Sequence, residues 1–174
     1  NKQYTANILQ SAKNVFKKEN AVVLKKIIDD KKISGLRKKI LGMKKSEEYH
    51  PLKFKWTKIN NTTDKRFESV IFESQLNLLC EFITGKKLKF EAIILENGDF
   101  FLLHDDLKPL TGPIAIIDIS EKWDNKWGGF LGIEQEPFFL EQNSITIINA
   151  KKRRWFIKRI NHHAKSKKIL IILK

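Results

Sequence analysis

Two residues of this 174-residue chain stand at a spacing that suits metal coordination. His104 and Asp106 form a His-x-Asp pair at the end of the apolar segment 100–104. Because side chains two residues apart in an extended strand point to the same face, the imidazole and the carboxylate are expected to converge on one side. A nitrogen donor and a carboxylate held together in this way can bind a single transition-metal cation. The pair therefore predicts a metal site at a strand end.

The residues around this pair follow a wider pattern. Asn97-Gly98-Asp99 precedes the strand as a turn, and Trp123 is followed, after four residues, by the pair Gly128-Gly129. These motifs resemble the metal-binding half of the Fe(II)/2-oxoglutarate oxygenases of the prolyl-hydroxylase-like group. That group has His-x-Asp at a strand end and Trp-x3-4-Gly-Gly about two strands later. The resemblance extends from Ile83-Thr84-Gly85 to the C-terminus, about half of the chain.

The resemblance implies that the His-x-Asp pair would bind iron and that a later strand would supply a distal histidine. Trp155 stands at that position, and an indole has no lone pair to offer a metal. Trp155 and Ile157 are two residues apart in the strand and so share a face, and Ile157 matches an inward-facing position of the family motif. We therefore expect the indole to point inward beside His104. His162 and His163 are the alternative ligands, but they lie in a polar segment typical of a hairpin loop. The expected iron site therefore lacks its third ligand.

The resemblance also implies a basic partner for the distal carboxylate of 2-oxoglutarate. Lys168, at the head of the apolar segment 169–172, is the best match, and Lys167 is the alternative. If the protein is an enzyme, the resemblance implies Fe(II) and 2-oxoglutarate as cofactors. The reaction would be hydroxylation of an unidentified small molecule or protein, with activity weak or lost. The alternatives are a non-catalytic binding module without a cofactor, with a partner held on the basic surface, and a cupin-type small-molecule protein.

The pattern of apolar residues predicts an α+β fold. Helices are expected at 3–18, 36–43 and 67–84, and strands at 21–28 and 52–59. Eight short strands are expected after Gly85, at 88–95, 100–104, 114–119, 129–134, 137–141, 144–149, 155–161 and 168–174. The strands match the double-stranded β-helix (jelly roll) in number and order. We therefore expect one domain over 1–174, with a helical and mixed support region at 1–86, a β-helix core at 87–174, and the N-terminal helices packed on one sheet.

Composition limits the possible partners. The net charge of +14 invites a nucleic-acid partner, but only five of the 34 basic residues are arginine, the residue suited to bidentate phosphate and base recognition. Nucleic acid is therefore not expected as a specific partner, and the densest basic cluster is 151–154. The lone Cys80 allows no intramolecular disulfide, and no apolar run is long enough to span a bilayer. We expect a cytoplasmic protein that does not bind membranes.

Overall fold

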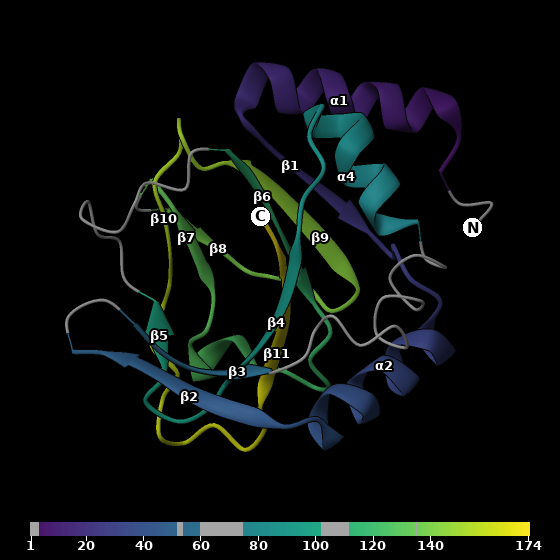
Figure 1. Cartoon of the computed structure of the whole chain (residues 1–174). Coiled ribbons are helices and arrows are strands. Elements are labelled where there is room, and N and C mark those ends of the chain that lie inside the picture. Colours follow the sequence, from purple (N-terminus) through teal and green to yellow (C-terminus); the bar gives the residue numbers. More distant parts are fainter. Residues whose placement is uncertain (1–3, 52–53, 60–74, 102–111, 135) are drawn as a thin grey trace.

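The computed structural model describes residues 4–51, 54–59, 75–101, 112–134 and 136–174. Within these ranges the helices are α1 (Ala6–Glu19), α2 (Asp30–Gly42) and α4 (Leu76–Thr84), with a short 3-10 helix at Asn125–Trp127 (Figure 1). The strands are β1 (Ala21–Lys25), β2 (Lys45–His50), β3 (Phe54–Ile59), β4 (Phe90–Leu95), β5 (Phe100–Phe101), β6 (Pro113–Asp118), β7 (Leu131–Ile133), β8 (Glu136–Phe138), β9 (Ser144–Asn149), β10 (Trp155–Ile157) and β11 (Lys168–Leu173).

These strands form one antiparallel sheet, in the order β1-β9-β6-β11-β4-β3-β5-β10-β7-β8, with β2 paired to β3 beside this path. Figure 1 shows the sheet curling over, so that the end made by β5, β10, β7 and β8 faces the part made by β9, β6, β11 and β4. The arrangement is a jelly roll. The N-terminal part of the chain contributes β1, β2 and β3 to the same sheet.

The helices cover the outer face of the larger part of the sheet (Figure 1). α1 packs beside α4, and each turns its buried side chains, such as Phe16 and Cys80, toward that face. Residues Ile169, Ile171 and Leu173 of β11 join the same core cluster. This confirms the expectation that the N-terminal helices pack on one sheet. The opposite face of β11, which includes Leu170, lines the interior of the jelly roll.

A second core cluster fills that interior. Residues that alternate with the helix-facing ones supply it from the larger part of the sheet, among them Ile93, Ile116 and Leu170. Trp155 and Ile157 supply it from the opposite side. Since side chains alternate across a strand, each central strand of the sheet is apolar on both faces, which explains its nearly continuous apolar sequence.

Several predicted element boundaries were wrong. The strand predicted at 21–28 ends at Lys25, because Lys26 has a φ of +55° and the backbone of Ile27 and Ile28 bonds instead to Asn143. The helix predicted at 36–43 begins at Asp30, because the Asp29 carboxylate accepts hydrogen bonds from backbone N–H groups of the first turn.

Two other elements also differ from the predictions. β2 was not predicted, since its polar sequence lacks the apolar alternation that marks a half-buried strand. The helix predicted at 67–84 begins at Leu76, after Gln75 in a left-handed conformation, and residues 67–74 lie outside the described part of the chain. Gly85 ends this helix with a φ of +74°, as predicted.

Candidate functional site

The turn that leads into the predicted metal site has the expected form. Gly98 has a φ of +85°, and the buried Asp99 carboxylate accepts a hydrogen bond of 2.9 Å from the backbone N–H of Glu96. The strand that follows, β5, pairs with β3 and β10. His104 and Asp106 themselves lie outside the described residues, so the convergence of their side chains stays a prediction.

Trp155 points into the jelly roll, as predicted. Its side chain is 7% exposed and belongs to the interior core cluster together with Ile157. The indole stacks on Phe101 with ring centroids 4.6 Å apart and an interplanar angle of 13°. Phe101 stacks in turn on Trp56 at 5.3 Å, and Trp56 on Phe54 at 4.2 Å. A continuous row of aromatic rings therefore crosses β10, β5 and β3 on the inner side of the sheet.

The alternative histidine ligands lie apart from this row. His162 and His163 are both exposed, in the turn that connects β10 to β11, with their rings 3.8 Å apart. The backbone carbonyl of His162 accepts a hydrogen bond from the Asn97 side chain, which ties the two turns together. Within the described part of the chain, no group of three or more His, Cys, Asp or Glu side chains is placed to hold a metal ion.

The two candidate co-substrate lysines face opposite sides of the sheet. Lys167 points outward and pairs with Glu96 at 2.7 Å. Lys168 is 1% exposed, and its Nζ lies 2.8 Å from the Oδ2 atom of Asp118, whose side chain is equally buried. Nζ also lies 4.7 Å from the centroid of the Trp123 ring. Burial lowers the pKa of Lys168, an effect that the neighbouring Asp118 carboxylate opposes.

The Trp-x4-Gly-Gly motif packs against the Lys168 side chain. The Trp123 indole N–H donates to the carbonyl of Gly128 at 3.1 Å, which holds the ring beside the lysine. A Cβ atom on Gly129 would lie 2.8 Å from the Cδ atom of Lys168, so only glycine leaves room for the lysine stem. The structure thus joins two features that the sequence left separate, the glycine pair and the candidate co-substrate lysine.

Asp118 was not among the site residues predicted from the sequence. A signal for it existed, since this carboxylate ends the apolar strand Pro113–Asp118 while Lys168 opens the apolar strand Lys168–Leu173. A charged residue on a strand buried on both faces needs a partner, because an isolated buried charge is costly. Opposite charges on two such strands therefore predict that the strands are neighbours and that the charges pair.

The residues around Lys168 do not fit a bound 2-oxoglutarate. The ammonium group already has a carboxylate partner within the chain, and rings of the aromatic row fill part of the interior. The buried Thr146 hydroxyl has no hydrogen-bond partner among the described residues. It lies on β9 in alternation with Ile145 and Ile147 of the helix-facing cluster, so it faces the interior.

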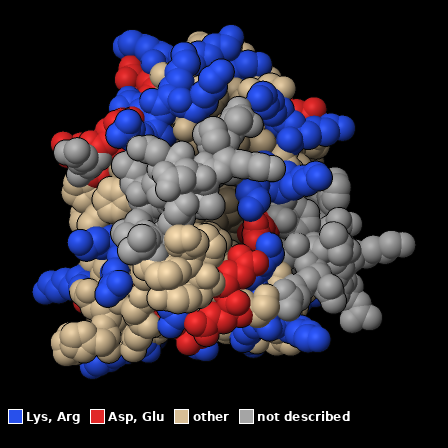
Figure 2. Space-filling view, turned by 60° about the vertical axis from the view of Figure 1, so that its left-hand side comes forward, with Lys and Arg blue, Asp and Glu red and all other residues tan. Residues whose placement is uncertain are grey.

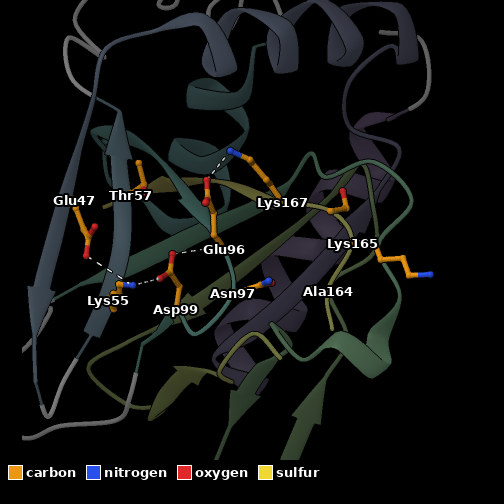
Figure 3. Close-up of a pocket in the computed structure, with 10 residues that line it drawn as sticks. Glu47, Lys55, Thr57, Glu96, Asn97, Asp99, Ala164, Lys165 and Lys167 are labelled. Atoms are coloured by element: carbon orange, nitrogen blue, oxygen red, sulfur yellow. Dashed lines mark hydrogen bonds and ion pairs between the residues drawn. The ribbon is translucent and has the colours of Figure 1, made fainter. Parts of the chain in front are cut away.

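A separate polar hollow of about 330 Å³ lies outside the jelly roll, between β3 and the turns at 96–99 and 164–167 (Figure 3). All of its charged side chains except Lys165 pair with one another. Lys55 lies 3.8 Å from Glu47 and 3.6 Å from Asp99, and Lys167 pairs with Glu96. Burial raises the pKa of Asp99. Because five of the charged side chains are paired within the chain, the hollow presents little unpaired charge to a ligand.

Comparisons with known proteins identify the fold. No protein-family model matches the chain, and no curated protein matches its sequence. Among solved structures, a prolyl-4-hydroxylase from Pseudomonas putida is similar, with 9% identity, a TM-score of 0.73, and 95% of this chain and 97% of that chain covered. A 2OG-Fe(II) oxygenase family protein from Burkholderia pseudomallei is similar at 8% identity, with a TM-score of 0.71 and 95% and 89% coverage.

HygX from Streptomyces hygroscopicus, whose structure holds nickel and 2-oxoglutarate, is similar at 9% identity, with a TM-score of 0.71 and 94% and 85% coverage. At sequence identities this low, the structural similarity shows the fold alone. The resemblance to the Fe(II)/2-oxoglutarate oxygenase superfamily, and the double-stranded β-helix that it implied, are therefore confirmed at the level of the fold.

Proposed function

Starting from the fold that this chain shares with Fe(II)/2-oxoglutarate oxygenases, we propose that it is a non-catalytic binding module. The observation that carries this proposal is the position of Trp155 at the start of β10. Its side chain is buried in the interior and stacks on Phe101 of β5. By the motif resemblance, a metal-binding histidine would stand there. A tryptophan both removes that ligand and fills the volume around it, because its ring is larger and has no lone pair.

The closed ion pair between Lys168 and Asp118 supports the same proposal. A lysine that binds a co-substrate carboxylate must keep its ammonium group available. Here a dicarboxylate would have to displace a buried partner that is covalently part of the chain, at the cost of leaving the Asp118 charge buried without its partner. On this proposal, the protein's own side chains Trp155 and Asp118 occupy the two ends of the expected iron and co-substrate site.

The module needs a surface for its partner, and we assign that role to the basic end of the molecule. Here the end of α1, with Lys17 and Lys18, adjoins the β9–β10 turn, with Lys151 and Lys152. Arg153 joins the two segments, since its guanidinium donates to the carbonyl of Glu19 at 3.0 and 3.2 Å. Figure 2 shows Lys and Arg side chains gathered at the top of the molecule, the end where α1 lies in Figure 1.

The choice between module and enzyme can be tested by measuring 2-oxoglutarate turnover. With Fe(II) and ascorbate, the wild-type protein is expected to produce no succinate above the background without protein. Turnover on the order of 1 per second, an ordinary enzymatic rate, would overturn the proposal. It would also mean that His162 or His163 reaches the metal, in a register different from the one described.

A substitution tests the role of position 155 itself. Trp155→His returns a metal-ligating side chain to the interior, so it is expected to raise the affinity for Fe(II), or for Mn(II) as a redox-stable probe. The matched control is Phe156→His, which places the same side chain on the opposite face of the same strand. Equal metal binding by both variants in calorimetric titrations would show that position 155 does not face the His104 and Asp106 pair.

A further inference from the structure

The ion pair inside the jelly roll is built into the sheet from several sides. Besides accepting from Lys168, Asp118 accepts a 2.8 Å hydrogen bond at Oδ1 from the backbone N–H of Ser120. The Ser120 hydroxyl in turn accepts from the N–H of Ile169 at 3.0 Å. Neighbouring residues Leu170 and Asp118 are register partners on β11 and β6. The carboxylate is therefore held at the lysine by backbone contacts of the two strands.

Both oxygens of this carboxylate are used in the way a protein holds a bound anion. One faces a buried cation and the other faces a backbone N–H group, and both donors come from fixed elements. The Trp123 ring lies against the ammonium group and the side chains of Lys168 and Asp118 are each only 1% exposed, so water has little access to the pair. Charge-assisted hydrogen bonds in such surroundings are short and strong.

We infer that Lys168 is a retained carboxylate-binding site whose ligand has become part of the chain, with Asp118 standing in for the carboxylate of a free acid. This inference rests on the proposed function. It states which class of ligand the co-substrate part of the site, at Lys168, would bind. It assigns to the site a single ligand class, small carboxylate anions, and it explains why the wild-type protein would not take one up. The internal carboxylate is held at a far higher effective concentration than any solute can reach.

The inference can be tested by removing the internal ligand and supplying a free one. Asp118→Gly deletes the atoms of an acetate ion from the interior and leaves the Lys168 ammonium group buried without a partner. Such a variant is expected to melt well below the wild-type protein, because an unpaired buried charge is strongly destabilising. Sodium acetate is then expected to recover most of the lost melting temperature in a saturable manner, because a ligand that binds only the folded state stabilises it.

Two controls separate carboxylate binding from general effects. Acetamide has the size of acetate but no charge, and it is expected to give no recovery at equal concentration, with sodium chloride matching the ionic strength. The double variant Asp118→Gly/Lys168→Met lacks the cation and is expected not to respond to acetate. Equal recovery by acetate and acetamide, or a response that persists without Lys168, would overturn the inference.

If Asp118→Gly does not fold in chloride, the same comparison is made on the yield of folded protein after refolding in each additive. Folding rescued by acetate alone supports the inference, and no rescue by acetate overturns it. None of these measurements depends on turnover. Oxidation of 2-oxoglutarate by the wild-type protein would therefore contradict the proposed function, whereas a variant indifferent to acetate would contradict only the assignment of Asp118.

Discussion

At the scale of single residues, the space around Lys168 is set by a glycine. Gly129 has a φ of +63°, a conformation that other residues adopt only with strain. A Cβ atom there would lie 2.5 Å from the Ile160 side chain and 2.8 Å from the lysine stem. The Gly-Gly pair, a motif recognised in the sequence for its resemblance to metal-binding proteins, thus has a packing role that does not depend on any metal.

Gly129→Ala is expected to destabilise the protein, because the added methyl group is both strained and overpacked. The loss in the free energy of unfolding is expected to be about 1–3 kcal/mol from overpacking alone. The matched control is Gly35→Ala in the exposed part of α2, where a Cβ atom would meet nothing within 4 Å. That change is expected to stabilise by about 0.5–1 kcal/mol. Urea titrations measure the change in the free energy of unfolding for both variants, and changes of the same sign would contradict the packing described.

At the scale of elements, a carboxylate of β4 ties three parts of the sheet together. Glu91 pairs through one oxygen with Lys58 of β3 at 2.7 Å and through the other with Lys174 after β11 at 2.6 Å. Burial acts to raise the pKa of Glu91, but the hydrogen bonds from the two lysines outweigh it and the pKa lies below the usual value of 4.5. The folded state therefore holds this proton less tightly than the unfolded chain does.

The sign of the pH dependence follows from that difference. At acidic pH the unfolded state binds the proton more readily, so the stabilisation from Glu91 is present above about pH 4.5 and is lost as the pH falls through the lower, folded pKa. Glu91→Gln is expected to reduce stability at pH 7 and to flatten the loss between pH 5 and pH 3. Glu136→Gln, an exposed carboxylate, is the control. Urea unfolding across this range checks it, and parallel curves for wild type and Glu91→Gln would contradict the assignment.

At the scale of the whole molecule, much of the architecture followed from local pattern. Of the strands buried on both faces, β9 at Ser144–Asn149 was predicted to the residue and β6 and β11 to within one residue at each end, because apolar β-branched runs between turns leave few alternatives. β2 escaped prediction because its stability comes from pairing with β3, which a local pattern does not record. The inward face of Trp155 was predictable from alternation alone.

The candidate site was less predictable, because its decisive contact joins residues 50 positions apart in the chain. Lys168 was identified through resemblance, but its pairing with Asp118 depends on β6 and β11 being neighbours in the sheet. That adjacency is a property of the whole topology. The opposite charges on two apolar strands were visible in the sequence, and they could have indicated the pairing only once the strand order was considered.

Like the strand order, the net charge of +14 is a property of the whole molecule, and it leads to a prediction about nucleic-acid binding. The basic end formed by α1 and the β9–β10 turn is expected to bind nucleic acid weakly and without regard to sequence, because its lysines neutralise phosphates without reading bases. Two duplex DNAs of unrelated sequence should bind equally in fluorescence anisotropy, and affinity should fall steeply with salt. Lys151→Glu/Lys152→Glu should weaken binding more than Lys44→Glu/Lys45→Glu, which changes the net charge equally in exposed residues before and within β2. A preference of about tenfold or more for one sequence at physiological salt would show that base recognition contributes.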